Sequence, residues 1–534
     1  MIRPDDQCDV LVVGAGPAGS TAAQLLASWG WSVVLVHRAA SPPGRPSLAE
    51  SLPSSTRKLF AFLGQLDRIE AAGFYPNEGN VARWAHASRA TRSADAGFHV
   101  SRGAFDQVLR DAAVAAGARI VDAVVRRVEA GDPIEVSYGT DHRRIETCAA
   151  RFVLDCSGRA GVVARRGFRR ADSRYRTLAI AAEWECAGWP ADEHTRTLVE
   201  SYRDGWAWSV PLSKTRRQCT VMIDPDRTAK AFPPPLAHDS CELRPGAPKR
   251  LQREGGALRG DAVPLSTLYK RELEKSVELR GRLVNAVQAS TPWTCDASIY
   301  DSARAADEGV LLVGDAASFI EPLSSAGVKK ALLSAWRAAV VANTCLRNET
   351  LAGAALDLYI GRERRVYAEC MRRSNAFFAE AAAAYGTPFW LTRAADADGL
   401  HPAAEEADVF TPDVSDAALA RDPDVRVAFD HLRASEHVRL RAAAALRFES
   451  VAIIEGREVV MRDALVLPGL DAPLQFAAGV NLPALARLAT ACGDVPALIA
   501  AYHAQVGPVP LTGLLTGLSL LVARHALVAE ASTS

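Results

Sequence analysis

The 534-residue sequence lacks several features that define common protein classes. Its ten cysteines are scattered, and none belongs to a C-x-x-C pair, so we expect no metal site and no dithiol centre. Lys plus Arg equals Asp plus Glu, at 62 each, so the chain has no excess of basic residues of the kind that nucleic-acid binding requires.

Long apolar runs and targeting segments are also missing. The opening residues MIRPDDQC are polar, unlike a secretory signal. The apolar stretch 508–528 is interrupted by prolines, glycines and Arg524, so we do not expect it to span a membrane. We therefore expect a cytoplasmic protein of two or three domains, with neither nucleic acid nor membrane as a partner.

A glycine-rich turn follows the first apolar segment. The order is a strand at 10–13, the turn GAGPAG at 14–19, a helix to about Trp29 and a second strand at 33–36. Strand, G-x-G-x-x-G, helix and strand in this order are typical of a dinucleotide-binding unit.

Each glycine of the turn has a physical task. Gly14 allows the tight turn, Gly16 lets the backbone approach a pyrophosphate, and Gly19 lets the helix pack closely on the strand. The helix N-terminus, which includes Ala18, offers N–H groups and partial positive charge to the phosphates.

The residue that follows the second strand departs from this pattern. An acidic side chain normally stands there and accepts hydrogen bonds from the ribose. Here the position is His37, followed by Arg38, and we expect these two residues to contact the nucleotide instead.

A second segment indicates which nucleotide binds. Residues 309–331 read GVLLVGDAASFIEPLSSAGVKKA and resemble the G-D motif of FAD-dependent monooxygenases of the hydroxybenzoate-hydroxylase type. The resemblance implies that Asp315 binds the ribityl chain. It also implies that the helix beginning at Gly327 and Val328 points its N-terminus at the flavin ring, where it would stabilise negative charge. The expected cofactor is therefore FAD.

Three shorter stretches agree with this resemblance. VSRGAFD contains an arginine that lies near the flavin in the family, LDCSGR resembles the family's aspartate–glycine element, and AESLP resembles the G-E-S-L-P stretch of halogenases and geranylgeranyl reductases. The cofactor-site residues that these resemblances assign are Arg102, Asp155 and Gly158. A second G-x-G-x-x-G is absent, so we expect NAD(P)H to visit only briefly or a separate flavin reductase to supply electrons.

The expected fold is α/β: a Rossmann-like FAD-binding domain of the hydroxybenzoate-hydroxylase type, an inserted β-sheet substrate domain and a mostly helical C-terminal module. The last module is similar to winged-helix modules, and it either docks a partner, covers the active site or is a structural cap. The predicted boundaries are 1–160 with 296–390 for the FAD-binding domain, 161–295 for the substrate domain, 391–430 for a linker and 431–534 for the C-terminal α+β module.

Two tryptophans, Trp206 and Trp208, stand two positions apart in a predicted strand, which places both indoles on one face. They either pack the sheet against the FAD domain or form the wall of a site for an aromatic molecule. Their stretch GWAWSVP resembles the W-x-W-x-I-P motif of flavin-dependent halogenases. FIEPLSSAG, which contains Ser325, resembles the chloride-side loop of the same enzymes.

The halogenase resemblance fails at the position of the catalytic lysine. In that family a lysine binds hypohalous acid beside the substrate, in a segment of the form G-F-x-x-K-x-G-x-x-F-x-W. The matching stretch here is GFYPNEGNVARW, with Asn77 at the lysine position and Arg83 as the next basic residue. Ser324 likewise stands where tryptophan halogenases have a glutamate.

The missing lysine leads us to predict an FAD-dependent monooxygenase that uses reduced flavin and O2 to hydroxylate an aromatic substrate, an indole or a phenol. The loop PLSSAGVKKAL also resembles flavoproteins that hydroxylate a tryptophan within a partner protein. The alternatives are a flavin-dependent halogenase, a geranylgeranyl-reductase-like flavoprotein and a non-catalytic flavin-binding partner protein.

The candidate catalytic residues follow from these motifs. They are Trp206, Trp208, Asn77, Glu50 and Ser325. A carboxylate or histidine near neutrality would assist by removing a proton from the ring substituent. The candidates for this base are His86, His99, Glu50 and Glu321.

Overall fold

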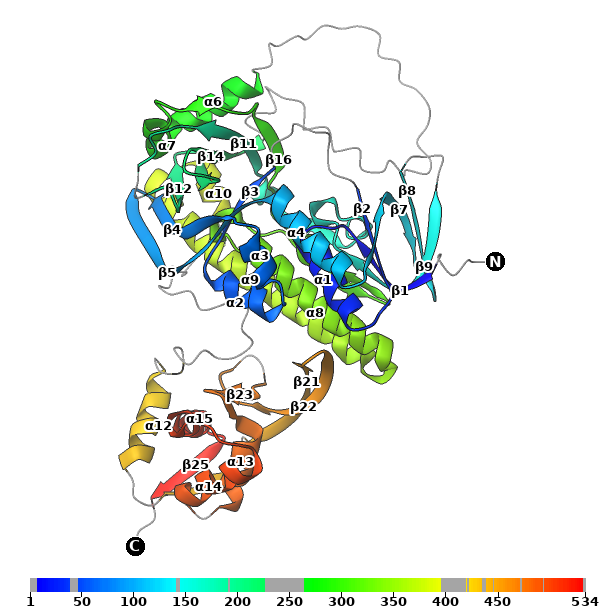
Figure 1. The fold of residues 1–534 in the computed structure, drawn as a ribbon. Helices are drawn as coiled ribbons and strands as arrows, with labels where there is room; N and C mark the ends of the chain where they lie inside the picture. Colours follow the sequence, from blue (N-terminus) through cyan, green and yellow to red (C-terminus); the bar gives the residue numbers. More distant parts are fainter. Residues whose placement is uncertain are drawn as a thin grey trace. The chain divides into compact units, whose positions relative to one another are not determined.

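A computed structural model gives the fold (Figure 1). It describes residues 7–38, 47–140, 145–190, 193–225, 264–394, 419, 422–434, 438–444, 446–470, 473–492 and 494–531. The chain forms two compact units, Met1–Ala404 and Glu405–Ser534. Most of the linker predicted at 391–430 falls outside the described residues.

The first unit contains a mostly parallel sheet with the strand order β18-β19-β9-β1-β2-β6, and β8 and β7 extend from β9. Its central strand β1 is completely buried at Val10, Leu11 and Val12, as a strand covered on both faces must be. The strands are β1 (Gln7–Val13), β2 (Val33–His37), β6 (Arg119–Asp122), β7 (Val124–Glu129), β8 (Ile134–Gly139), β9 (Glu146–Asp155), β18 (Ala306–Asp307) and β19 (Val310–Leu312).

The helices of this unit pack partly against this parallel sheet and partly against a second sheet (Figure 1). Helix α1 contacts both α4 and α8, and the small buried residues Ala22, Ala23, Ala335 and Ala338 of α1 and α8 suit close helix packing. The helices are α1 (Pro17–Ser28), α2 (Ser55–Phe62), α3 (Leu66–Ala71), α4 (Arg102–Ala115), α6 (Leu265–Lys275), α7 (Val277–Arg282), α8 (Gly327–Arg347), α9 (Ala352–Tyr385) and α10 (Pro388–Arg393).

A second sheet, mostly antiparallel, has the order β15-β11-β14-β13-β12-β4-β5-β3, with β16 on β11. Its strands are β3 (Ala49–Leu52), β4 (Tyr75–Trp84), β5 (Ala87–Ser101), β11 (Leu178–Glu185), β12 (Arg196–Tyr202), β13 (Gly205–Pro211), β14 (Arg216–Ile223), β15 (Val287–Gln288) and β16 (Trp293–Asp296). The sheet therefore also recruits 49–101, a segment that the sequence analysis gave to the FAD-binding domain. The pairing of β4 with β12 joins this segment to the second sheet. Pairing between strands so distant in the sequence cannot be predicted from a local sequence pattern.

Hydrophobic clusters cover both faces of the second sheet. On one face, Tyr269, Leu273 and Leu279 of α6 and α7 pack against β11, β13 and β14. On the other face, Phe378 of α9 and Trp390 of α10 belong to a cluster that includes Trp84 and Trp206. The second cluster lies on the side of the sheet that carries both tryptophans of β13.

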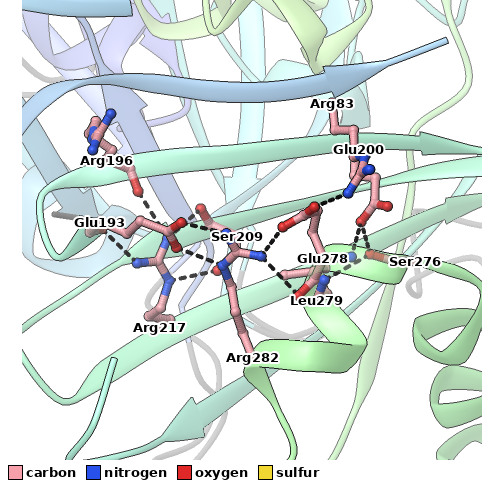
Figure 2. Close-up of polar contacts among 10 residues, drawn as sticks. All are labelled: Arg83, Glu193, Arg196, Glu200, Ser209, Arg217, Ser276, Glu278, Leu279 and Arg282. Carbon is pink, nitrogen blue, oxygen red and sulfur yellow. Dashed lines mark hydrogen bonds and ion pairs between the residues drawn. The ribbon is translucent and has the colours of Figure 1, made fainter. Parts of the chain in front are cut away.

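A network of buried charges attaches α7 to the sheet (Figure 2). Glu200 on β12 is 3% exposed and accepts hydrogen bonds from the hydroxyl of Ser276 and from the backbone N–H groups of Val277, at 2.9 Å, and Glu278, at 3.0 Å. These N–H groups begin α7 and have no partner within the helix, so the carboxylate satisfies them and complements the helix dipole.

The second unit has its own core of Leu, Val and Ala residues, centred on α13 and α15. Its elements are α12 (Pro423–Ala434), β20 (Val438–Ala442), β21 (Arg447–Glu455), β22 (Glu458–Val466), β23 (Phe476–Ala477), β24 (Val480–Asn481), α13 (Leu482–Ala491), α14 (Val495–Gln505), α15 (Leu511–Ala523) and β25 (Leu527–Ala531). The hairpin β21–β22 and the helices α13, α14 and α15 give this unit both strands and helices. Within the described ranges, no helix has both the length and the apolar character needed to cross a bilayer.

Replacing Glu200 with alanine is expected to lower the free energy of unfolding of the first unit by roughly 2–3 kcal/mol, because two N–H groups at the start of α7 and the hydroxyl of the buried Ser276 lose their acceptor. The measurement is urea denaturation followed by tryptophan fluorescence. Glu70→Ala is the matched control, since its ion pair with Arg57 is partly exposed and such pairs contribute about 0–1 kcal/mol. Equal destabilisation by the two variants would contradict the capping role of Glu200.

Candidate cofactor and substrate cavity

The first unit contains a cavity of about 440 Å³ that runs from the glycine-rich turn to the second sheet. Its wall combines the β1–α1 turn, the end of β2, the start of α4, the loop after β19, the start of α8 and strands β11, β13 and β14. Segments distant in sequence thus meet around one space.

The glycine-rich turn lines one end of this cavity through Gly14, Gly16 and Ala18. Gly14 has a φ of +99°, and a Cβ there would lie 2.6 Å from the carbonyl oxygen of Cys156. Gly19 does not line the cavity, and its Cβ would lie 1.8 Å from the oxygen of Gly14. Gly14 and Gly19 are thus required by packing.

Gly16 differs from its two neighbours because a Cβ there would meet only the guanidinium of Arg102, at 3.7 Å. Gly16 caps α1, and no side chain supplies a hydrogen bond to this helix N-terminus. The N-terminus of α1 therefore offers both open space and N–H groups that no side chain caps. This combination fits the pyrophosphate of a dinucleotide.

His37 and Arg38 line the cavity where β2 ends. Nε2 of His37 lies 2.7 Å from Oδ1 of Asp122, and its Nδ1 lies 3.1 Å from the carbonyl oxygen of Arg38. Asp122 ends β6 directly beside His37 in the sheet. The acidic residue that usually follows the second strand is therefore absent here. A carboxylate from the neighbouring strand pairs with His37 but does not line the cavity.

Arg102 and Glu50 meet in the cavity wall from α4 and β3. The Arg102 guanidinium donates to both carboxylate oxygens of Asp106, at 2.9 and 3.1 Å, and to Glu50 at 3.4 Å. Burial raises the pKa of the Glu50 carboxyl group above its usual value, and the charge of Arg102 partly offsets this effect. Glu50 is therefore a carboxyl group that can hold a proton nearer neutrality than an exposed glutamate does.

Asp155 is completely buried at the end of β9 and does not line the cavity. Its carboxylate accepts hydrogen bonds from the N–H and hydroxyl of Ser157 and from the N–H groups of Val163, at 2.7 Å, and Ala164, at 3.1 Å. It shapes the turn that presents Gly158, which does line the cavity.

The loop after β19 also lines the cavity. Gly314 has a φ of +61°, and Asp315, which follows it, lines the cavity. The start of α8 lines it through Gly327 and Val328, and Ser325, with a φ of +48°, does so just before the helix. The side chain of Ser324 lies outside the described residues.

The two tryptophans of β13 have different roles. They share one face of the strand, as predicted, with ring centroids 5.8 Å apart. Trp206 is 1% exposed and packs against Trp84 within the core, whereas Trp208 lines the cavity. Trp206 therefore agrees with the packing interpretation, and Trp208 lies in a cavity wall, where its contact with an aromatic molecule stays a prediction.

Glu321 lies behind this wall, between the cavity-lining residues Ile320 and Pro322. It is 2% exposed and hydrogen-bonds to Trp206. Burial raises the pKa of its carboxyl group to about 7, although Arg393 and the Trp206 hydrogen bond act in the opposite direction. Glu321 thus connects the loop after β19 to Trp206, the core ring that packs against Trp208.

Asn77, at the lysine position of the halogenase segment, does not line the cavity. Its amide donates to the hydroxyl of Ser51, at 2.9 Å, and to the carbonyl of Leu52, at 3.0 Å, and its oxygen accepts from Gly79. These bonds hold a bulge in β4. Arg83 does not replace the lysine either, because it pairs with Glu278 on α7 (Figure 2).

The two histidine candidates for a general base also lie away from the cavity. His99 is buried, burial lowers the pKa of its imidazole to about 3, and Nε2 lies 3.1 Å from the carbonyl oxygen of Thr195. His86 stacks edge-on against Tyr385, with ring centroids 4.8 Å apart. Of the four candidates, only Glu50 lines the cavity.

The sequence analysis did not predict several residues that line the cavity. Arg110 lies two helical turns after Arg102 on α4, so the helical period could have identified it. Arg159 directly follows Gly158. Thr220 and Met222 of β14 face the cavity next to β13, and their position depends on strand pairing that no local pattern reveals.

The geometry can be compared with known proteins. The model of a family described as Tryptophan halogenase matches residues 75–419. The chain belongs to the tryptophan halogenase family. Tryptophan 2-halogenase of Chondromyces crocatus is 30% identical over 362 residues, which cover 66% of this chain and 64% of that protein. Flavin-dependent halogenase armH4 of Armillaria mellea is 27% identical, covering 63% of this chain and 65% of that protein. The aligned part is thus slightly less than two thirds of these relatives.

Two solved structures share the fold over nearly the whole chain. CmlS, a flavin-dependent halogenase, has a TM-score of 0.71 at 21% identity and covers 98% of this chain and 96% of its own. QhpG, a peptidyl tryptophan dihydroxylase of tryptophylquinone cofactor biogenesis, has a TM-score of 0.64 at 20% identity and covers 97% of this chain and 99% of its own.

These comparisons confirm the predicted family and fold class, and FAD as the cofactor of that family. They change the order of the functional predictions, because the curated relatives are named halogenases. The names of the relatives thus support the alternative prediction, halogenation, better than the hydroxylation that the sequence analysis preferred.

Gly16→Ala is expected to weaken FAD binding by an order of magnitude or more, because a methyl group would stand where the cofactor approaches. A tenfold loss of affinity corresponds to about 1.4 kcal/mol of binding free energy. The thermal unfolding of the cofactor-free protein should not change, because the new Cβ meets no other protein atom closer than 3.7 Å. FAD fluorescence titration and differential scanning fluorimetry measure the two effects.

Gly19→Ala is the matched control for this experiment and should lower the unfolding temperature directly, because its Cβ would overlap the Gly14 oxygen. Wild-type affinity for FAD in Gly16→Ala would contradict the assignment of the turn.

Glu321 is expected to make stability depend on pH. Its pKa in the folded protein, about 7, is above the ordinary 4.5, so the folded state binds the proton more tightly. The stabilisation is fully present below the ordinary pKa and is lost as pH rises through 7. The unfolding temperature of wild type relative to Glu321→Gln should therefore fall from about pH 5 to about pH 8. A constant difference would exclude a shifted Glu321.

Proposed function

We propose that this protein uses reduced FAD and dioxygen to oxidise an electron-rich aromatic substrate. The observation that carries the proposal is the continuity of the cavity, which runs from the glycine-rich turn past Asp315 to a wall containing Trp208. A flat cofactor and a flat substrate fit successive parts of such a space, and aromatic walls favour aromatic ligands.

The residues of the chain divide the work along the cavity. The α1 N-terminus and Gly16 would hold the pyrophosphate, with Arg102 supplying positive charge. Asp315 would bind the ribityl chain, and the α8 N-terminus would stabilise negative charge at the ring. When bound, FAD supplies the redox chemistry with dioxygen, and the protein supplies orientation and electrostatics.

Halogenation is the first candidate reaction. The support is the family membership together with the names of the curated relatives, which are halogenases that include a tryptophan 2-halogenase. An indole or a similar electron-rich ring would then be the substrate, and halide the source of the transferred atom.

Hydroxylation is the second candidate, and one specific observation favours it. Among the residues that the structure describes, no lysine lines the cavity, and Asn77 is engaged in a strand bulge. Without an ammonium group to bind hypohalous acid, transfer of an oxygen atom to the ring is the simpler outcome. The structural neighbour QhpG is a peptidyl tryptophan dihydroxylase. We therefore include a tryptophan within a partner protein among the proposed substrates for hydroxylation.

The reaction requires an electron source, which we propose is NAD(P)H that binds briefly or a separate flavin reductase. The sequence contains one G-x-G-x-x-G turn, at 14–19, and that turn lines the FAD cavity. A second nucleotide would therefore need a different mode of binding.

The experiment that tests the function uses the full chain loaded with FAD, a flavin reductase with NADH, and free tryptophan, indole and phenol as probes. Bromide-dependent products with the bromine isotope pair in mass spectra are expected for halogenation. An oxygen atom derived from 18O-labelled dioxygen, with or without bromide, is expected for hydroxylation. The Gly16→Ala variant serves as the control for reactions of free flavin. If neither bromine nor labelled oxygen is incorporated into tryptophan, indole or phenol, the result would contradict the proposal that free aromatic rings are substrates.

A further inference from the structure

Lys330 of α8 is completely buried, with 0% exposure, although lysine is rarely found inside proteins. Its Nζ donates to the carbonyl oxygens of Gly314, at 3.0 Å, and Ser318, at 2.5 Å, and it lies 3.5 Å from Oδ1 of Asp315. All three partners belong to the loop after β19 that carries Asp315 into the FAD cavity.

The set of partners identifies the group as a charged ammonium. An ammonium has three N–H donors and no acceptor, and the loop presents three acceptors to it. Burying such an ion is costly unless each donor is satisfied, and here each donor has an oxygen. Two of the oxygens are neutral carbonyls, so only Asp315 carries a compensating charge.

The position of Lys330 separates it from the ligand-contacting residues. Gly327, Val328 and Ala331 of the same helix line the cavity, whereas Lys330 does not. Lys330 and Ser334, one turn apart, face the loop instead, and Ser334 accepts the N–H of Gly314 at 2.9 Å. The ammonium therefore acts from behind the loop, close to the cavity but without access to a substrate.

We propose that Lys330 is a positioning residue that fixes the loop 314–318 and provides a buried positive charge behind Asp315, and that this charge sets how tightly FAD binds and how readily it is reduced. The proposal rests on FAD as the cofactor of the cavity and is independent of whether halogen or oxygen is transferred.

The electrostatic reason follows from the sign of the charges. Reduction adds negative charge to a flavin, and the carboxylate of Asp315 at the cavity wall opposes that charge. A buried ammonium 3.5 Å from the carboxylate offsets it in a medium where charges are weakly screened. Without Lys330, Asp315 would act alone and the loop would lose the donor for two carbonyl groups.

The test compares Lys330→Gln and Lys330→Met with wild type in the full chain loaded with FAD. The midpoint potential of bound FAD is measured by anaerobic spectroscopic titration, and FAD affinity by fluorescence. Both variants should have a lower potential. FAD affinity should fall ~10-fold in Lys330→Met, because buried carbonyl groups lose their donor. These measurements need no turnover, so a failure to find the enzyme's reaction does not affect them.

Two controls separate charge from packing. Lys330→Arg keeps the charge and should retain a potential close to wild type, and Lys329→Met removes a neighbouring charge of the same helix and should leave it unchanged. If Lys330→Met does not fold, Lys330→Gln decides, because it keeps hydrogen-bond donors without the charge. A wild-type potential in Lys330→Gln would overturn the proposal, as would an equal decrease in Lys329→Met.

Discussion

The close contact between helix α1 and the turn that precedes it is the constraint on which the cavity depends. A Cβ at Gly19 would lie 1.8 Å from the Gly14 oxygen, so only glycine lets the helix begin where it does. This contact directs the helix N-terminus and Gly16 into the cavity, beside the ends of β1, β2 and β9. The same edge of the parallel sheet then gathers Gly158 and Asp315, because carboxyl ends of parallel strands lie together.

Around this edge, buried charges hold the surrounding loops. Asp155 fixes the turn after β9, Lys330 fixes the loop after β19, and Glu200 holds α7 on the second sheet. Each charge satisfies several backbone groups, and none of the three lines the cavity. Buried ions contribute to stability only when their hydrogen bonds are complete. Asp155 and Lys330 thereby hold two segments beside the cavity, whereas Glu200 holds a helix of the second sheet that does not line it.

One segment of β4 bears on whether this chain shares the halogenation reaction of its family. The chain belongs to the tryptophan halogenase family, and its relatives favour halogenation. Yet Asn77 has the role of a structural amide, bonded to Ser51 and Leu52, and Arg83 is paired with Glu278. The cofactor end of the cavity is therefore lined by the residues that the motifs predicted, whereas the segment expected to carry a catalytic lysine has Asn77 and Arg83 in structural contacts.

The sequence by itself determined the glycine-rich turn and the shared face of Trp206 and Trp208, because each depends on spacing within one turn or strand. The loop that carries Asp315 was predicted from its resemblance to the G-D motif. Only the tertiary structure decided which of these residues reach the cavity. It placed Trp208 in the wall and Trp206 in the core, paired His37 with Asp122, and joined 49–101 to the second sheet. These outcomes arise from contacts between distant segments, which local periodicity does not encode.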